Sequence, residues 1–276
     1  RIDPDQPIDV QFTQVSLMEA LQSFAAQLEA QVAQVGGTLF IGLPESTDRI
    51  RTAIELRTAE LRRFEGEDAL GRQFTLLRGT TLAWPDLAEP ARLFDEVCAT
   101  FQIEQRGSAR VPHDLWAAGA MADVNAVEAL SLLLGQFDLT FAWQQQAAAM
   151  SIEPLPSSIT VRREHTPRQQ ELAEALTSLR EQFPHLEPQV SGRSLAVEAT
   201  VGEHEAIAAF LNPSPAVSMP GESSLGPLAR RRFTLKATRA EAIAILRTLQ
   251  TQDVTIEYDP AALRQAGIDL QQMIRS

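Results

Sequence analysis

His113 and Asp114 come nearest to acid–base chemistry, and they stand side by side in the segment 111–116, V-P-H-D-L-W. A histidine titrates near neutral pH, and a neighbouring carboxylate can orient its ring. However, adjacent residues of an extended segment point to opposite sides, and no nucleophile is evident. We therefore expect a structural role, with Trp116 packed in a core and Asp114 acting as a cap. A hydrolase that uses His113 and Asp114 is kept as an alternative.

The residue types that bind metals are sparse. Cys98 is the only cysteine, so the sequence allows no internal disulfide and no cysteine-based metal site. Its setting, F-D-E-V-C-A-T-F, predicts a thiol packed on an apolar helix face. The other histidines (His165, His185 and His204) are far apart in the sequence, and Ala208 stands where an H-E-x-x-H zinc motif would need its second histidine. We predict no catalytic, cofactor-binding or metal-binding residues.

Two further patterns invite a ligand. Gly36-Gly37 precedes an apolar strand, but no Gly-Lys-Ser/Thr follows, so we expect a tight hairpin turn and not a phosphate loop. Trp84, Trp116 and Trp143 offer aromatic rings that a cell-wall glycan would use. All three stand in core-like patterns, so a glycan-binding module is the second alternative.

Composition and charge exclude some partners. The formal net charge is −12, which argues against binding to a nucleic-acid backbone. Residues 230–232 are the only strong basic cluster, which we expect to begin a solvated strand, with an acidic partner site as the alternative. No stretch is long and apolar enough for direct membrane insertion. Because the chain begins with Arg1, we expect it to be a processed piece, so a missing signal peptide is uninformative.

One sequence pattern recurs among the elements that position these residues. A cap residue is followed at the third position by Glu, then Ala, then Leu or Ile, which predicts a capping box at a helix start. Three matches in one phase indicate a duplicated unit, although ordinary amphipathic helices that share a cap would look alike. The three starts are Ser16 with Glu19, Asn125 with Glu128, and Thr238 with Glu241.

A long helix is predicted from Pro44 to about Phe64. It carries Arg and Glu at spacings such as Arg51–Glu55 and Glu60–Arg63, which is typical of a solvated helix face. A partner-binding role for that face is the alternative.

Residues 158–211 show a different order, β-α-β-β-α. Thr166-Pro167 predicts the start of the first helix, with Gln169 as its box partner. Thr200 and Glu203 predict the cap of the second helix.

The predicted fold class is α+β, with tandem small βαβ and βαββα modules whose short mixed sheets are covered by helices. We call the predicted parts the first, second, third and last units. Because of the Pro-rich linker, we expect the last unit to move separately and to be truncated at its C-terminus. In order, they are residues 1–65, 66–156, 157–212, the linker 213–228, and 229–276.

Residues 233–246 with 254–259, F-T-L-K-A-T-R-A-E-A-I-A-I-L and V-T-I-E-Y-D, resemble the secretin and TonB N-terminal short (STN) domain. Residues 121–143 and 8–41 resemble it less closely. Residues 158–211 resemble the βαββα ring-building modules of secretin periplasmic regions. The resemblance implies a periplasmic or cell-envelope location, modules in a row and protein–protein contacts. It brings no catalytic residues, and nothing here corresponds to a membrane β-barrel.

The leading functional hypothesis is a non-enzymatic interaction or assembly module of a bacterial cell-envelope protein, similar to secretin or TonB systems. It would bind a protein partner or its own copies through sheet edges. We expect no cofactor.

Overall fold

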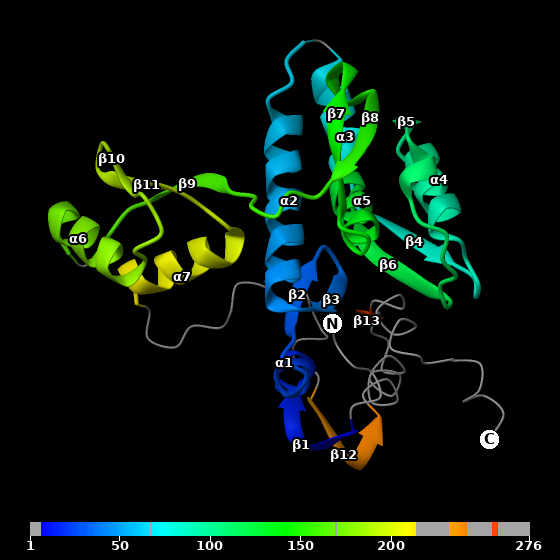
Figure 1. The fold of residues 1–276 in the computed structure, drawn as a ribbon, viewed down its shortest axis with the longest axis horizontal. Coiled ribbons are helices and arrows are strands. Elements are labelled where there is room, and N and C mark those ends of the chain that lie inside the picture. The colour runs from blue at the N-terminus through cyan, green and yellow to red at the C-terminus, as the bar shows by residue number, and fades with distance from the viewer. Residues whose placement is uncertain (1–6, 67, 169, 214–231, 242–255, 259–276) are drawn as a thin grey trace.

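The computed structural model describes residues 7–66, 68–168, 170–213, 232–241 and 256–258. This part of the chain is α+β, with helices packed on short sheets of two or three strands (Figure 1). The fold class predicted from the sequence is confirmed.

The first unit begins as predicted. Strand β1 (Pro7–Ser16) leads directly into helix α1 (Leu17–Gln27). At the junction, the Ser16 hydroxyl accepts from the Glu19 N–H at 3.3 Å, and the Glu19 carboxylate accepts from the Ser16 N–H at 2.8 Å. This reciprocal pair is the predicted capping box. Strands β2 (Gln31–Val35) and β3 (Thr38–Gly42) then form the predicted hairpin.

Helix α2 (Pro44–Arg62) stands between two parts of the molecule (Figure 1). Pro44 lacks a backbone N–H, and the first position of a helix does not need one, so proline there favours a helix start. One side of α2 packs against the second unit, and the other side contacts the third unit. The predicted helix is confirmed, and it is the element that joins the units.

The second unit contains two sheets. Strands β4 (Thr80–Trp84) and β6 (Gly119–Val124) are antiparallel. In the other sheet, β8 (Ala149–Pro154) pairs in parallel with β5 (Glu104–Arg106) and antiparallel with β7 (Leu139–Gln144). The helices are α3 (Ala69–Leu77), α4 (Pro90–Thr100) and α5 (Ala126–Gly135), with short 3₁₀ turns η1 (Ser108–Arg110) and η2 (Gln145–Ala147).

Helix α3 of the second unit was not predicted from the sequence. Residues 121–124 form the end of β6, and Met121 and Val124 are buried where they pair with β4. The Asn125–Glu128 capping box at the start of α5 is confirmed, with hydrogen bonds of 3.1 and 2.8 Å.

Helix α5 lies at the centre of the largest hydrophobic core. Every side chain from Ala126 to Leu134 except Glu128 is buried. The same core contains Phe40, Ile50 and Leu61 of the first unit. Side chains on both sides of residue 65 therefore share one core, and the division at that point stays a prediction about sequence units.

The third unit has the predicted order β-α-β-β-α. Its sheet runs β10-β11-β9, all antiparallel, and a separate core lies between the sheet and the two helices. The elements are β9 (Val161–His165), α6 (Leu172–Gln182), β10 (Gln189–Ser191), β11 (Ser194–Ala199) and α7 (Val201–Leu211).

The predicted start of α6 at Pro167 is wrong, because the helix begins at Leu172. The Thr166 hydroxyl hydrogen-bonds to the Ser194 hydroxyl at 2.7 Å. The Arg168 N–H donates to the side chain of Asn212 at 3.0 Å. These contacts hold the segment after β9 in a non-helical path, so Thr166 does not act as a helix cap.

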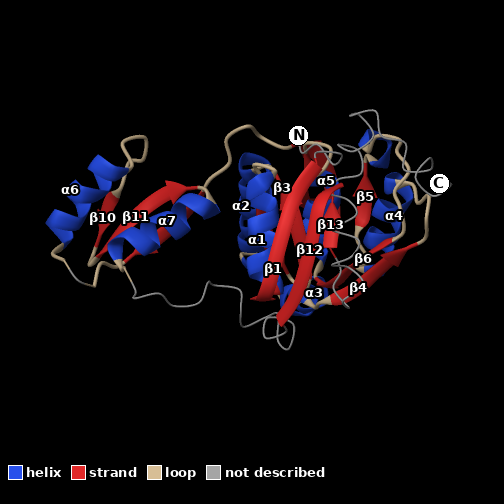
Figure 2. Cartoon of the chain, turned by 90° about the horizontal axis from the view of Figure 1, so that it is seen from below, coloured by secondary structure: helices blue, strands red, loops and turns tan. Residues whose placement is uncertain are grey.

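The last unit contributes β12 (Arg232–Glu241) and β13 (Ile256–Tyr258). The predicted helix start at Thr238 is wrong, because β12 stays paired with β1 as far as Glu241. Figure 2 shows β1 and β12 side by side, and β13 pairs in parallel with β3. The last unit is therefore joined to the first and does not stand apart as predicted. The linker beyond Pro213 and the rest of the predicted last unit, residues 242–255 and 259–276, lie outside the described residues.

Candidate functional site

The start of α7 packs against the polar face of α2. Asp48 and Thr52 are four residues apart, so both side chains lie on one face of α2. The Gly202 N–H donates to the Asp48 carboxylate at 2.6 Å, and the Val201 N–H donates to the Thr52 hydroxyl at 3.0 Å. A helix start leaves several N–H groups unpaired and is electropositive, so a carboxylate and a hydroxyl there stabilise the contact.

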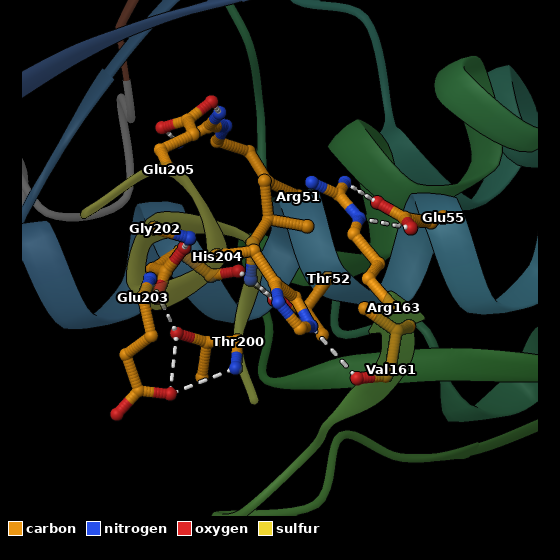
Figure 3. Close-up of polar contacts among 12 residues, drawn as sticks. Arg51, Thr52, Glu55, Val161, Arg163, Thr200, Gly202, Glu203, His204 and Glu205 are labelled. Atoms are coloured by element: carbon orange, nitrogen blue, oxygen red, sulfur yellow. Dashed lines mark hydrogen bonds and ion pairs between the residues drawn. The ribbon is translucent and has the colours of Figure 1, made fainter. Parts of the chain in front are cut away.

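The same helix start carries its own capping box. The Thr200 hydroxyl accepts from the Glu203 N–H at 3.2 Å, and the Glu203 carboxylate accepts from the Thr200 N–H at 2.8 Å (Figure 3). This confirms the cap predicted from the sequence. Gly202 allows the close approach of α2, since a Cβ there would lie 2.8 Å from the Asp48 carboxylate. The capping box and the contacts from α2 together provide hydrogen-bond acceptors for the N–H groups in the first turn of α7.

Two bidentate ion pairs flank this junction. Arg51 binds the Glu205 carboxylate of α7 through both terminal nitrogens, and Arg163 of β9 binds the Glu55 carboxylate through Nε and Nη2 (Figure 3). Hydrogen bonding to Glu55 raises the pKa of Arg163. Fork-to-fork pairs of this kind add geometric specificity as well as charge attraction.

The solvated face predicted for α2 is therefore wrong. Arg51 and Glu55 do not pair with each other, because each pairs across the junction. Glu60 pairs with Arg57 at 2.7 Å and not with Arg63. Exposed pairs within a helix are worth only about 0.2–0.5 kcal/mol, so partly buried bidentate partners from another unit outcompete them.

Arg49 of α2 makes a third contact, with the segment that follows β8. Its guanidinium donates to the carbonyls of Leu155 and Pro156 at 3.0 and 3.2 Å, and to the Asp138 carboxylate at 3.2 Å. This holds the connection between β8 and β9 against α2. The third unit is thus fixed to α2 at both its beginning and its last helix.

A histidine pair lies inside the third unit, beside the junction. His204 is fully buried, and its Nε2 lies 2.9 Å from the carbonyl of Val161 (Figure 3). Since a carbonyl only accepts, His204 carries its proton on Nε2, and its Nδ1 accepts from His165 Nε2 at 2.9 Å. With both rings neutral every hydrogen bond of this pattern is made, whereas two protonated rings would place donor against donor.

Burial, followed by the neighbouring His204 and Arg163, lowers the pKa of His165 to about 4. Burial also lowers the pKa of His204; the Val161 carbonyl and the nearby Glu55 and Glu203 oppose this shift, and Arg163 adds to it. Both rings therefore resist protonation in the folded chain.

Acidification is expected to destabilise the third unit. Between about pH 6.5 and pH 4 the unfolded chain takes up protons that folded His165 does not, so the free energy of unfolding falls as the pH falls. The variant His165→Gln keeps a donor without titrating, and we expect it to lose less stability over this range. Urea unfolding at a series of pH values measures the slope. An equal slope in the variant would contradict the assignment.

Loss of the Thr52 hydroxyl is expected to weaken the junction. Thr52→Val removes the acceptor for the buried Val201 N–H without changing shape, which costs about 1–3 kcal/mol of unfolding free energy. Thr100→Val is the matched control, because both hydroxyls donate to the carbonyl four residues earlier, at 2.7 and 2.8 Å. Thr100 is exposed on α4, so its substitution should change little. Equal losses in the two variants would contradict a role at the junction.

Asp114, one of the two residues considered for acid–base chemistry, has a structural role. Its carboxylate accepts from the Leu115 N–H at 2.8 Å and from the Trp116 indole N–H at 3.2 Å. Trp116 is buried, as expected, whereas His113 is exposed. Asp114 thus caps its own turn and not a helix. This arrangement argues against a hydrolase built on His113 and Asp114.

The tryptophans are packed as well. Trp84 donates its indole N–H to the Ala117 carbonyl at 2.8 Å, and Trp143 donates to the Arg57 carbonyl at 3.0 Å. Trp84 and Trp116 lie with ring centroids 6.0 Å apart in the core. Rings used in this way do not offer an open platform to a sugar, so the glycan alternative loses its support.

The remaining candidate residues form no reactive or metal-binding group. Cys98 is buried, and burial, followed by Asp95, raises the pKa of its thiol to about 12. His185 lies 2.6 Å from Glu203, away from the His165–His204 pair. Within the described residues, no three or more His, Cys, Asp or Glu side chains are grouped to hold a metal ion. The described helices include none that is long and apolar enough to span a bilayer.

Sequence reasoning missed the residues that build the junction. Asp48 and Thr52 carry no motif, and their i,i+4 spacing on a charged helix face was the one available signal. Glu205 was passed over as part of an incomplete zinc motif. Their roles depend on α7 reaching α2, a contact between residues about 150 positions apart.

Comparison with known proteins adds little. No protein-family profile matches the chain. No curated protein matches it either. Among solved structures, the chain is similar to one described as "Structure of XcpQN012", with 12% sequence identity, 64% of this chain and 99% of that chain covered, and a TM-score of 0.21. A similarity of this strength carries no argument about fold or function.

Proposed function

We propose that the chain is a non-enzymatic protein–protein interaction or assembly module of a bacterial cell-envelope protein of the secretin or TonB-system kind, located in the periplasm. The STN-like and ring-building-like sequence patterns support this, and so does the α+β fold of small sheets. The division into units at residues 65, 156 and 212 belongs to the same proposal. A protein partner, or further copies of the chain, would bind at sheet edges.

The exposed edge of β10 is the observation that carries this proposal. In the sheet β10-β11-β9, strand β9 lies toward α2 and β10 lies at the far end (Figure 1). Val190 in the middle of β10 is 56% exposed, which is unusual for a valine in a strand. An edge strand with an exposed apolar side chain can accept a strand from a partner.

A surface depression lies next to this edge. Its volume is about 480 Å³, and it is lined by Arg180, Pro184, Leu186, Glu187, Pro188 and Gln189. Because β10 has only three residues, it offers few main-chain hydrogen bonds, so a partner needs side-chain contacts as well. The depression mixes charged and apolar side chains and would receive side chains of an added strand.

The test is capture of a partner from a native envelope extract with the purified chain as bait. Val190→Lys places a charge on the β10 edge and should reduce specific capture at least about 10-fold, as expected for a central contact. Leu87→Lys is the matched control: Leu87 is 52% exposed but lies outside the strands, so capture should be retained. Equal capture by both variants would rule out the β10 edge, and failure of the wild-type chain to retain any protein or to self-associate would reject the function.

A further inference from the structure

The second unit contains a complete seven-element arrangement, β4-α4-β5-β6-α5-β7-β8. Its first and fourth elements, β4 and β6, form an antiparallel pair. Its third element, β5, pairs in parallel with β8, and β8 pairs antiparallel with β7. One two-stranded sheet and one three-stranded sheet are thus built from a continuous stretch of chain.

The two ends of the chain form the same pattern from separate pieces. Strand β12 pairs antiparallel with β1, as β4 does with β6. Strand β13 pairs in parallel with β3, and β3 pairs antiparallel with β2, as β5, β8 and β7 do. We call residues 7–42, which hold β1, α1, β2 and β3, the N-terminal half. We call residues 232–258, which hold β12 and β13, the C-terminal half.

Local details support this equivalence. Helices α1 and α5 each follow directly on the strand that is the fourth element of the arrangement, and each begins with a complete capping box, at Ser16 and Asn125. Each helix leads into an antiparallel hairpin. Both two-stranded ladders contain a register shift. The described elements of the two ends therefore match six of the seven elements of the second unit in permuted order, and the position that corresponds to α4 lies outside the described residues.

This permutation removes a covalent link. In the second unit, residues 107–118 join β5 directly to β6. In the split unit, the end of β13 and the start of β1 belong to opposite ends of the chain, so strand pairing is the direct connection between the halves. Residues 212–231 lead from α7 to β12 and contain Pro213, Pro215, Pro220 and Pro227. Fully extended, a segment of this length spans at most about 70 Å, which allows the C-terminal half to reach another copy.

The sequence charges of the two halves are complementary. Asp9 lies in β1 and follows Asp3 and Asp5, whereas Arg232, Lys236 and Arg239 lie in β12 and follow Arg230 and Arg231. The antiparallel register places position 9 beside positions 238 and 239. Opposite charges at cross-strand positions favour this pairing over others.

We propose that the N-terminal half of one copy binds the C-terminal half of a second copy, which gives a dimer by reciprocal exchange. This rests on the proposed function and names the partner as the chain itself. Each copy has one acceptor half and one donor half, so exchange satisfies every strand pair that the single chain satisfies and closes with two-fold symmetry. Whether the two halves pair within one chain or between two chains then depends on the protein concentration relative to the effective concentration of the tethered half.

Two variants of the chain, each with one introduced cysteine in addition to Cys98, test this directly. Gln11 and Lys236 are paired across β1 and β12, and residues opposite each other share a face of the sheet. A Gln11→Cys copy and a Lys236→Cys copy are unfolded together in urea, refolded as a mixture and treated with a short bis-maleimide. Cys98 should stay unreactive in the refolded chain because its thiol is buried with a pKa of about 12.

We expect a cross-linked dimer whose yield rises with protein concentration toward about 1 mM and exceeds the control at least about 10-fold. The control mixture combines Gln11→Cys with Glu153→Cys, an exposed position of β8 outside the β1–β12 pairing. A dilute chain with both Gln11→Cys and Lys236→Cys should cross-link within itself. If this internal cross-link forms and the mixed copies do not exceed the control, exchange is overturned; if it does not form, the β1–β12 pairing is absent and the proposal fails with it.

This outcome is separable from the proposed function. If exchange fails while Val190→Lys still abolishes partner capture, the exchange alone is rejected. If exchange occurs and no envelope protein is captured, self-association is supported and the foreign partner is rejected.

Discussion

Gly36→Ala is expected to lower the free energy of unfolding by about 2–5 kcal/mol. Gly36 lies in the turn between β2 and β3 at φ +57°, a region that costs other residues about 1–2 kcal/mol. An added Cβ would also lie 2.3 Å from the Asp123 carbonyl oxygen of β6, and such overpacking costs about 1–3 kcal/mol. Urea unfolding followed by circular dichroism measures the loss.

Two other glycines separate these causes. Gly192 has φ +61° but open space around a Cβ, so Gly192→Ala should cost only the backbone term of about 1–2 kcal/mol. Gly71 lies in α3 with nothing near a Cβ, so Gly71→Ala should stabilise by roughly 0.5–1 kcal/mol. If Gly36→Ala lowers the free energy of unfolding no more than Gly192→Ala does, the turn is not in close contact with β6.

The close approach at Gly36 explains why the hairpin matters for the whole molecule. The Gly37 N–H donates to the carbonyls of Ala122 and Asp123 at 3.1 and 3.2 Å. The buried Thr38 hydroxyl accepts from the Ala122 N–H at 3.0 Å. The glycine pair thus joins the first unit to β6 of the second unit in addition to turning the chain.

Phe94→Ala is expected to cost about 3–5 kcal/mol of unfolding free energy. Phe94 lies on α4, is fully buried and belongs to the core around α5. Truncation removes the transfer free energy of the ring and leaves a cavity that a close-packed core fills only in part. The measurement is again urea unfolding, followed here by tryptophan fluorescence because Trp84 and Trp116 lie in the same core.

Phe74→Ala is the matched control for this prediction. Phe74 also lies on a helix, α3, but is 71% exposed, so its truncation should change stability by no more than about 0.5 kcal/mol. Similar losses at the two positions would mean that α4 does not pack on α5 as described.

Local interactions explain which sequence predictions were confirmed. The capping boxes at Ser16, Asn125 and Thr200 each join residues three apart, and the Gly36-Gly37 turn joins adjacent strands. Such contacts form within a few residues of the chain, so the sequence nearby contains all of their partners. For the same reason the β-α-β-β-α order of the third unit could be predicted.

The candidate site could not be predicted, because its partners come from distant parts of the chain. The pattern around Thr238 matches the capping boxes, yet β12 continues through it because β1 offers a strand partner. The charged face of α2 is typical of a solvated helix, yet Asp48 and Thr52 cap α7, and Arg51 and Glu55 pair across the junction. Tertiary partners outweigh local preference at these positions because they bury polar groups that are costly to leave unpaired.

The sequence by itself determined the fold class, the hairpin, the start of α2 and the three capping boxes that were confirmed, since each depends on near neighbours. Only the tertiary structure decided that strands from the two ends of the chain pair with each other. It also decided that α2 joins the second unit to the third. The physical reason is that strand pairing and helix docking are chosen among all surfaces of the folded chain, and a linear pattern does not encode which surfaces meet.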